Sequence, residues 1–494
     1  MRPLSKGREG EAKAPALKAT PLALALFALL ALASCAVGPD YVKPPAIMQD
    51  KFKEMEGWKK AEPKDQMLRG NWWEAFNDPE LNALVEQVEI SNQNIAVAEA
   101  NYGQSLALVD QAAAAYFPTA TIGPSLTRVY RSTGSAASAA AAATASAKTV
   151  NIYSLPVNAN WVPDLWGQVR RSVEAARGNA QVSAANLVNA RLSAQAQLAQ
   201  DYFQLRALDA QKRLLHETVE AYRKSLELTE NRYKAGVASR GDVLQADTQL
   251  KTTQAQEVDV GVQRAQLEHA VALLAGKAPA DFALPFSPLS AIPPAIPVGV
   301  PSELLERRPD VAAAERNMAA ANAQIGVAIA AYYPTVSLGA AAGFLSTDLS
   351  KWLTWPSRFW SMGPAISQLV YDGGLRKART AQARAAYEGA VASYRQTVLT
   401  GFQEVEDNLA ALRILEQEAA VQAEAVAAAE QSLAVMENQY RAGTVAYLNV
   451  IVAQTTVLSA KITALGILGR RMTAAVLLVK ALGGGWNISD LPKG

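Results

Sequence analysis

The chain carries an internal duplication, which limits it to folds built from two similar halves. The sequence Asn-Arg-Tyr-Lys-Ala-Gly at 231–236 recurs as Asn-Gln-Tyr-Arg-Ala-Gly at 438–443, an offset of 207 residues. Two more pairs of segments match in the same order at offsets of 216 and 206, namely 115–119 with 331–335 and 166–170 with 372–376. Three collinear matches predict that one structural unit occurs twice.

Each copy has the same predicted order of elements. A helix (about 79–115, then 302–331) precedes a Tyr-aromatic-Pro break, a β-hairpin (about 119–163, then 335–370), a very long helix, a turn at the Ala-Gly motif and a last helix. Proline, which would break a helix, is absent between Pro163 and Pro279 and between Pro364 and Pro492. The first long helix, about 167–233, would measure on the order of 100 Å, a length suited to crossing the periplasm.

Apolar residues in the long helices are spaced by threes and fours, which is typical of coiled coils. These residues are Leu215, Val219, Tyr222, Leu226, Thr229 and Tyr233 in the first copy, and Phe402, Val405, Leu409 and Leu412 in the second. The copies extend over 79–276 and 302–482. Between them, 277–301 contains seven prolines and is predicted to be an extended connector lying across the helices.

The predicted strands alternate apolar residues with small or polar ones. The apolar positions are Tyr153, Leu155, Val157, Ala159 and Trp161 in one strand, and Val336, Leu338, Ala340, Ala342 and Phe344 in the other. Alternation over about ten residues suits a membrane barrel, although a soluble β-sandwich has the same pattern. Aromatic residues gather at both ends of the hairpins, as at bilayer interfaces, which favours the membrane barrel.

Two hairpins give four strands per chain, fewer than the eight that the smallest membrane barrels have. Other copies of the chain would therefore complete the barrel, with 8, 12 or 16 strands for a dimer, trimer or tetramer. The Ala/Ser-rich stretch 132–147 joins the strands of the first hairpin as a flexible outer loop or a short helix.

The amino terminus has the features of a lipoprotein signal. Residues 1–34 form a signal peptide, with a basic start and an apolar run that ends in small residues before Cys35. The segment Leu32-Ala33-Ser34-Cys35 matches the bacterial lipobox, which predicts a covalent lipid on Cys35 and cleavage before it. Ala36 in the next position implies sorting to the outer membrane, so 35–78 would be a lipid-anchored amino-terminal segment.

The composition argues against catalysis and nucleic-acid binding. The formal net charge is +2, and much of the basic charge lies in the signal peptide, so the remainder offers no basic surface for nucleic acid. One cysteine and two separated histidines, His216 and His269, make no metal cluster, and surface positions are expected for both histidines. The common catalytic motifs are absent. We therefore expect neither an enzyme nor a cofactor, apart from the lipid on Cys35.

Several longer motifs occur along the whole chain after residue 34. They are Cys-Ala-Val-Gly-Pro-Asp-Tyr at 35–41, Trp72-Trp73 with Phe76, Pro-Ser-Glu-Leu-Leu-Glu-Arg-Arg-Pro-Asp at 301–310, Ala314-Glu315, Tyr-Asp-Gly-Gly at 371–374, and Ala-Leu-Gly-Gly-Gly-Trp at 481–486. With these motifs the chain resembles the TolC-like outer membrane factors, in particular the lipoprotein branch that serves resistance-nodulation-division efflux pumps.

The resemblance implies a mainly α fold with a membrane β-barrel. Three chains would form a twelve-stranded β-barrel and a periplasmic α-barrel, with an equatorial belt built from the termini, including the tail 483–494, and the connector. It implies a periplasmic adaptor (membrane fusion) protein and an inner-membrane transporter as partners, together with outer-membrane lipid. The function implied is an exit duct that passes drugs or other small toxic compounds outward when its periplasmic entrance opens.

The same resemblance assigns the site residues. The adaptor would dock on the tip turns Tyr233, Lys234, Ala235, Gly236, Val237 and Tyr440, Arg441, Ala442, Gly443, Thr444. Gly236 and Gly443 suit such turns, because a helix often ends on a left-handed glycine. Many relatives have acidic residues beyond the second tip, where this chain has Asn449 and Val452; the first copy keeps Asp242 and Asp247. Strong cation selectivity at the entrance is therefore not expected.

Two alternatives remain from the sequence. The same architecture serves heavy-metal efflux and protein secretion, although the lipobox and the Arg-Pro-Asp motif favour pump-type efflux. A structural lipoprotein without a pore is the other alternative, and the alternating strands argue against it.

Overall fold

The computed structural model describes residues 36–46, 51–54, 71–131, 148–290, 292–296, 307–486, 489 and 491. Our expectations for the signal peptide 1–34, for Cys35 and for the loop 132–147 concern residues outside these ranges. The same holds for parts of the amino-terminal segment, the connector and the carboxy-terminal tail.

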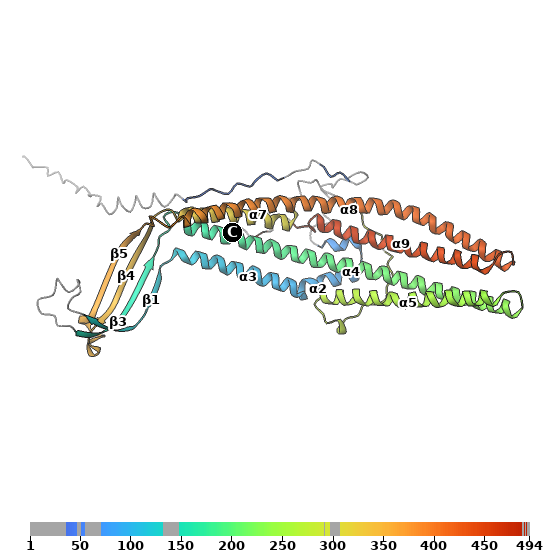
Figure 1. The fold of residues 1–494 in the computed structure, drawn as a ribbon, viewed down its shortest axis with the longest axis horizontal. Coiled ribbons are helices and arrows are strands. Elements are labelled where there is room, and N and C mark those ends of the chain that lie inside the picture. The colour runs from blue at the N-terminus through green and yellow to red at the C-terminus, as the bar shows by residue number, and fades with distance from the viewer. Residues whose placement is uncertain are drawn as a thin grey trace, which may run out of the picture. The chain divides into compact units, whose positions relative to one another are not determined.

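The two copies contain corresponding elements in the same order (Figure 1). The first copy comprises α2 (Pro79–Ser91), α3 (Gln93–Ala113), β1 (Thr119–Ile122), β2 (Ser125–Arg131), β3 (Lys148–Trp161), α4 (Gln168–Lys234) and α5 (Arg240–Leu274). The second comprises α7 (Pro309–Ala330), β4 (Thr335–Ser346), β5 (Arg358–Ser367), α8 (Leu375–Arg441) and α9 (Tyr447–Ala481). Short 3-10 helices accompany them: η2 (Trp72–Phe76), η3 (Ala114–Tyr116), η5 (Pro279–Asp281), η7 (Leu349–Lys351) and η8 (Trp355–Ser357).

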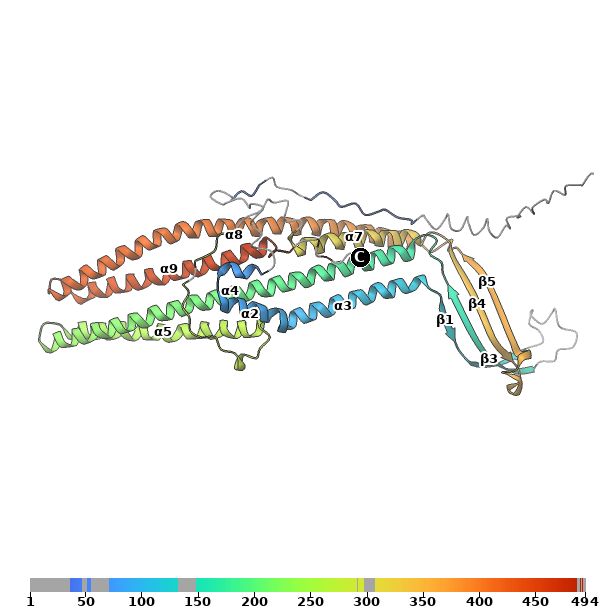
Figure 2. The same ribbon diagram turned by 180° about the vertical axis from the view of Figure 1, so that it is seen from behind.

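Packing does not follow the sequence copies. One compact unit comprises Asp110–Ala175 and Asn322–Ala385 with the described part of Met1–Tyr41, and the other comprises Val42–Val109, Ala176–Ala321 and the described part of Ala386–Gly494. Each unit contains residues of both copies, and in the first unit strand β3 of the first copy pairs with strand β4 of the second (Figure 2). The copies 79–276 and 302–482 are therefore repeats in sequence and not separate packing units.

The long helices match the spacing of their apolar residues. Helices α4 and α8 have 67 residues each, about 100 Å at 1.5 Å per residue. Leu215 and Val219 of α4 are buried, and so are Phe402, Val405, Leu409 and Leu412 of α8. Tyr233, the last residue of the first series, lies in the last turn of α4 and is 47% exposed.

The helix expected at 79–115 is two helices. Asn92 between them has an extended backbone. Its side-chain oxygen accepts hydrogen bonds from the N–H groups of Asn94 and Ile95, and its amide nitrogen donates to the carbonyl of Leu274 at 2.8 Å. Asn92 thus caps α3 and ties the break to the end of α5, a contact that the local apolar spacing does not reveal.

Helix α9 is the one described helix with the length and composition of a membrane-crossing segment, at a mean hydropathy of 1.6 over 18 residues. Core helices meet the same criteria, and 44% of this window is buried within the chain. Arg470 and Arg471 of α9 form ion pairs with Glu418 and Glu416 of α8. These ion pairs connect α9 to α8.

The strands form one antiparallel sheet in which β3 and β4 are central (Figure 1). Strands β1 and β2 both pair with β3 in a continuous register, with Ile122 opposite Val157 and Ser125 opposite Ser154. They are one strand interrupted at Gly123 and Pro124, where proline has no N–H to donate. The first hairpin therefore contains a broken strand, and β1–β2 and β5 are the outer edges of the sheet formed by the described strands.

Over most of its length the register gives the sheet one apolar face and one small or polar face, whereas at the outer end of β2 and β3 the second face also carries Val129 and Ile152. Directly opposed residues point to the same side, and Leu155 and Val157 of β3 lie opposite Phe344 and Ala342 of β4. The same face continues through Ala120, Ile122, Leu126 and Tyr130 on one edge and through Trp360, Met362 and Ile366 on the other. On the opposite face Thr121 lies across from Asn158, and the hydroxyl oxygens of Ser125 and Ser154 are 2.7 Å apart.

Candidate functional site

The turn between α4 and α5 is closed by a glycine. Gly236 has a φ of 75°, in the left-handed region, and a Cβ added there would meet no atom within 4 Å. Its N–H donates to the carbonyl of Tyr233 at 2.9 Å, and the N–H of Val237 donates to the carbonyl of Arg232 at 2.8 Å. This pair of bonds is the Schellman arrangement, which satisfies the last carbonyls of a helix.

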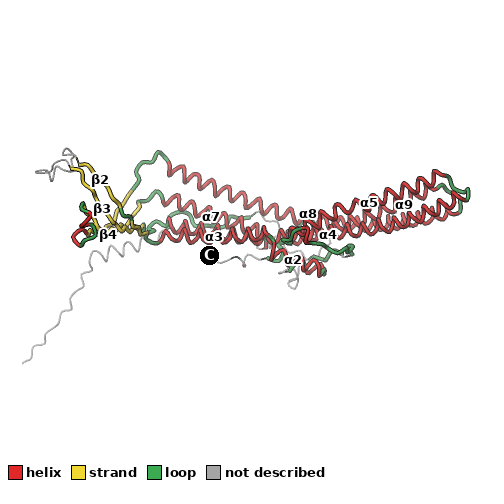
Figure 3. Tube along the Cα trace, turned by 90° about the horizontal axis from the view of Figure 1, so that it is seen from below, coloured by secondary structure: helices red, strands yellow, loops and turns green. Residues whose placement is uncertain are grey.

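The turn between α8 and α9 has the same geometry. Gly443 also has a φ of 75°, and its N–H donates to the carbonyl of Tyr440 at 3.0 Å. The N–H of Thr444 and its hydroxyl both donate to the carbonyl of Gln439 at 3.0 Å. The repeated sequence therefore makes two equivalent turns, which close the two helical hairpins (Figure 3).

The helices that follow the two turns begin differently. Ser239 caps α5 in a reciprocal arrangement with Asp242, at 3.1 Å from the Asp242 N–H to the Ser239 hydroxyl and 3.0 Å from the Ser239 N–H to the carboxylate. Ala446 precedes α9 without a side-chain cap. The carboxylate of Asp242 thus stabilises the first turn of α5. Asp247 is half-buried one turn further on, and Asn449 and Val452 are exposed at the start of α9.

The sequence-predicted tip residues are exposed, with one exception. Tyr233, Lys234, Ala235, Gly236 and Val237 are exposed in the first turn, and Arg441, Ala442, Gly443 and Thr444 are exposed in the second. Tyr440 is only 7% exposed. The expectation that it forms part of the docking surface is therefore wrong for this structure, because its ring lies inside the helical unit.

The ring of Tyr440 belongs to a cluster that links the two hairpins, which we call the clasp (Ser225, Arg232, Tyr440 and Tyr447). The Tyr440 and Tyr447 rings are 5.1 Å apart, and the Arg232 guanidinium lies 4.7 Å from the Tyr440 ring. Arg232 also donates to the carbonyl of Arg441 at 3.2 Å, and the hydroxyl oxygens of Ser225 and Tyr447 are 3.0 Å apart. Burial raises the pKa of Tyr447, so its hydroxyl stays protonated at neutral pH.

Sequence reasoning missed Ser225, Arg232 and Tyr447. A signal was present, because two of them stand where the copies differ: Arg232 corresponds to Gln439, and Tyr447 corresponds to Arg240. At these two positions a difference between otherwise similar turns coincides with a contact between the hairpins.

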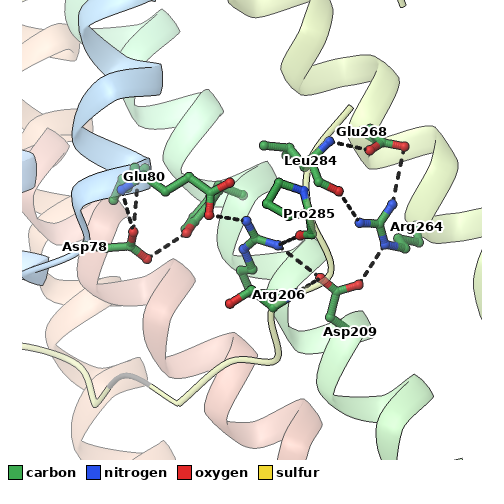
Figure 4. A network of polar contacts seen from close by, with 11 residues as sticks. Asp78, Glu80, Arg206, Asp209, Arg264, Glu268, Leu284 and Pro285 are labelled. Atoms are coloured by element: carbon green, nitrogen blue, oxygen red, sulfur yellow. Dashed lines mark hydrogen bonds and ion pairs between the residues drawn. The ribbon is translucent and has the colours of Figure 1, made fainter. Parts of the chain in front are cut away.

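A buried ionic network fixes the connector to the helices (Figure 4). Asp209 of α4 is fully buried and accepts hydrogen bonds from Arg206 at 3.1 Å, Arg264 at 2.7 Å and the N–H of Ser287 at 3.1 Å. Arg206 also donates to Glu80 of α2 and to the carbonyl of Pro285, each at 2.6 Å. Helices α2, α4 and α5 are thereby joined to residues 284–287.

The described amino-terminal residues are held beside the sheet. The N–H of Val37 donates to the carbonyl of Trp166 at 3.1 Å, and Asp40 pairs with Arg171 at 2.6 Å. Trp166 stacks on Tyr333 with ring centroids 5.0 Å apart, where the second copy's helix meets its strand. Residues 36–40 are therefore fixed next to one of the predicted aromatic belts.

Nothing in the described part of the chain resembles a metal centre, since no group of three or more His, Cys, Asp or Glu side chains could hold an ion. His216 is exposed and contacts Glu257 at 2.9 Å, and His269 is exposed on α5. The surface positions expected for both histidines are confirmed.

Comparison with known proteins identifies the family. The outer membrane efflux protein family matches residues 84–277 and 300–484, which is well over half of the chain. The chain belongs to the outer membrane efflux protein family. The family resemblance found in the sequence, the expected fold and the expected outer-membrane location are thereby confirmed. The known members that are similar to this chain are channel proteins.

Individual relatives agree with this assignment. The probable efflux pump outer membrane protein TtgC of Pseudomonas putida is 31% identical over 470 residues, covering 94% of this chain and 95% of the relative. The solved structure of the outer-membrane channel OprN is 31% identical with a TM-score of 0.84, covering 92% of this chain and all of that chain. The open-state MtrE channel of Neisseria gonorrhoeae, at 24% identity and a TM-score of 0.78, shows the same fold. This efflux family member is therefore an outer-membrane channel component of an efflux pump.

Proposed function

We propose that three copies of this chain form the exit channel of a tripartite efflux pump. The observation that carries this proposal is the sheet, which has one apolar face, one small or polar face and two edges without a partner strand among the described residues. Open edges in a membrane leave backbone groups unsatisfied, so closure with other copies is required. Four strand positions from each of three copies would give the twelve-stranded barrel.

The helical hairpins form the periplasmic entrance in this proposal. The clasp holds the hairpin α4–α5 to the hairpin α8–α9, and opening requires the two hairpins to separate. Asp242, Asp247, Asn449 and Val452 would lie at this entrance. Asp242 is engaged in capping α5 and half-buried, which supports weak rather than strong attraction of cations.

A periplasmic adaptor protein docks on the exposed tip turns in this proposal, and an inner-membrane transporter of the resistance-nodulation-division class supplies the substrate. Tyr233 and Val237 support the docking assignment because they are large apolar groups that are 47% and 65% exposed. Apolar groups of this size at a helical turn suit a protein contact. Tyr440 is not part of this surface.

Substrates are proposed to be small organic compounds. The names of similar proteins refer to antibiotic efflux, toluene efflux and pyoverdine export, so the family's range is wide. Thr, Ser, Asn, Gly and Ala predominate on the polar face of the described strands, and Arg131 and Lys148 occupy opposed positions of the same face at the ends of β2 and β3. A mostly uncharged lining over the rest of these strands is compatible with passage of compounds of either charge.

A lipid on Cys35 anchors the chain in this proposal. The support is the fixed position of residues 36–40 beside Trp166, which would place acyl chains at the membrane interface. Replacing Cys35 with Ser should remove the lipid mass from the mature protein, as intact-mass spectrometry can measure. A wild-type protein without added lipid mass would contradict this part of the proposal.

The channel function is tested in two parallel measurements. Purified protein in planar bilayers should conduct ions, and cells lacking their own exit channel should lose drug sensitivity when this chain is supplied with its pump partners. A purified trimer that never conducts, together with unchanged drug accumulation in the cells, would show that the chain forms no pore.

A further inference from the structure

Two arginines lie on the apolar face of the sheet. Arg128 lies opposite Asn151 in the register that places Leu126 opposite Tyr153, so it shares a face with Leu126 and Tyr130. Arg358 lies opposite Phe344 and shares its face with Trp360 and Met362. Both arginines are exposed in the single chain. A charged side chain on the lipid face is tolerated near a membrane interface and opposed at the bilayer centre.

Both arginines stand at the same end of the strands. Arg358 is the first of the ten residues of β5, which ends at Ser367 near the start of α8. Arg128 is the tenth residue counted from Thr119, where β1 begins near the end of α3, and β2 continues beyond it to Arg131. A strand of about ten residues crosses the bilayer at a tilt. In the membrane barrel proposed above, each arginine would therefore lie one membrane span away from the helices, at the outer leaflet.

Charges at the two ends of the strands are balanced differently. At the helix end, Arg170 pairs with Asp164 at 3.6 Å and Arg376 pairs with Asp372 at 2.6 Å. At the outer end, no described carboxylate lies within ion-pair distance of Arg128 or Arg358 in this chain. Asp348 is the only acidic residue of the described strands and of 347–357, and it accepts hydrogen bonds from the N–H and hydroxyl of Ser350.

Aromatic residues surround the outer arginines. The Arg358 guanidinium lies 3.9 Å from the centre of the Trp355 ring, which orients it without neutralising it. Trp355 is 72% exposed, and Tyr130 next to Arg128 is 67% exposed. Amphipathic rings of this kind sit at the headgroup level of a membrane. Lys351 adds a further exposed cation in the turn between β4 and β5.

We infer that Arg128 and Arg358 bind the phosphate groups of outer-leaflet lipid, whose headgroups are phosphorylated sugars. Guanidinium groups bind phosphate with two parallel hydrogen bonds, which makes arginine well suited to this ligand. The contact would fix the depth of the barrel at the outer surface. It rests on the outer-membrane location and goes beyond the channel function.

The test uses the full-length purified oligomer in lipid nanodiscs of phosphatidylcholine. Bisphosphorylated lipid A and its dephosphorylated form are the two probes, and their retention is measured by native mass spectrometry. The wild type should favour the phosphorylated form about tenfold or more, and the double variant Arg128→Gln/Arg358→Gln should lose most of that preference. Lys224→Gln, which removes an exposed cation from α4, is the matched control and should change nothing.

Salt dependence gives a second readout if the double variant fails to assemble. The wild-type preference should fall steeply toward about 1 M salt, where screening acts over about 3 Å. The conservative variant Arg128→Lys/Arg358→Lys should keep a reduced preference. A wild type without preference for phosphate, or a preference that survives both the double substitution and high salt, would overturn the inference. Conductance in pure phosphatidylcholine bilayers should be normal for all variants, which separates this result from failure of the channel proposal.

Discussion

At the residue scale, Gly236 and Gly443 both provide the left-handed backbone conformation that ends a long helix. Both residues have a φ of 75°, and no neighbouring atom would obstruct a side chain at either position. The requirement is therefore conformational, since other residues pay about 1–2 kcal/mol to adopt left-handed geometry. This physical reason could be predicted from the sequence, because a glycine follows each long helix.

We expect Gly236→Pro and Gly443→Pro to impair efflux while leaving the oligomer and its membrane insertion intact. Proline excludes the positive φ and removes the N–H that donates to the carbonyl of Tyr233 or Tyr440. Cross-linking to the adaptor and drug accumulation are measured on the same cells. Gly261→Ala on α5 is the control, because this glycine has no positive φ and meets no atom within 4 Å. Normal cross-linking and efflux in both proline variants would contradict the assignment of the tip turns as the docking site of the adaptor.

At the scale of elements, the clasp and the ionic network hold helices together by different means. The clasp consists of one contact between two aromatic rings, one hydroxyl pair, one charge–aromatic contact and one hydrogen bond to a carbonyl. Such contacts are individually modest, which suits hairpins that must separate. Asp209 at the centre of the ionic network is fully buried, and its loss leaves the buried Arg206 without one of its partners.

Tyr447→Phe should loosen the two hairpins by removing the hydroxyl contact with Ser225. The loss is about 0.5–1.5 kcal/mol, the usual net contribution of one hydrogen bond. In planar bilayers we expect longer or more frequent open periods than in the wild type. Ser225→Ala should have a similar effect, and the double variant should add little to either single change. Additive effects would mean that the two hydroxyl groups do not act on each other.

Asp209→Ala should detach the connector from α4 and α5. It removes the acceptor of Arg206, Arg264 and the Ser287 N–H at once, with a destabilisation of about 3–5 kcal/mol. Hydrogen exchange of residues 282–290 should rise markedly. Asp201→Asn is the comparison, since Asp201 of the same helix accepts a hydrogen bond from the side chain of Gln197 at 2.9 Å and burial raises its pKa. Unchanged exchange in Asp209→Ala would show that the network does not hold the connector.

At the scale of the whole molecule, the strand register joins the hairpins of the two copies into one sheet that has an open edge on each side. The copies meet where β3 pairs with β4, and the apolar and polar faces of the two hairpins coincide in this pairing. A shift of one residue would place Leu155 on the polar side, so the faces specify the register. The remaining edges, β1–β2 and β5, come from different copies.

We expect the purified protein to be a trimer in mild detergent and to remain one after dilution. The reason is the two strand edges, whose N–H and C=O groups cannot be satisfied by lipid. Light scattering with correction for bound detergent measures the protein mass. Trp161→Ala, away from the edge strands, should leave the mass unchanged. A homogeneous monomer would contradict both the barrel and the channel.

The amino-acid sequence alone determined the features that depend on local periodicity and local backbone geometry. The 67-residue helices, the glycine turns and the alternating strand faces follow from spacing within short windows. Only the tertiary structure decided where residues that correspond between the two copies differ in burial and in contacts. Tyr440 is buried in the clasp whereas its counterpart Tyr233 is exposed, because each meets different neighbours from distant segments. The break at Asn92, the network of Asp209 and the position of Arg128 opposite Asn151 likewise depend on pairings between residues far apart in sequence, which local patterns do not encode.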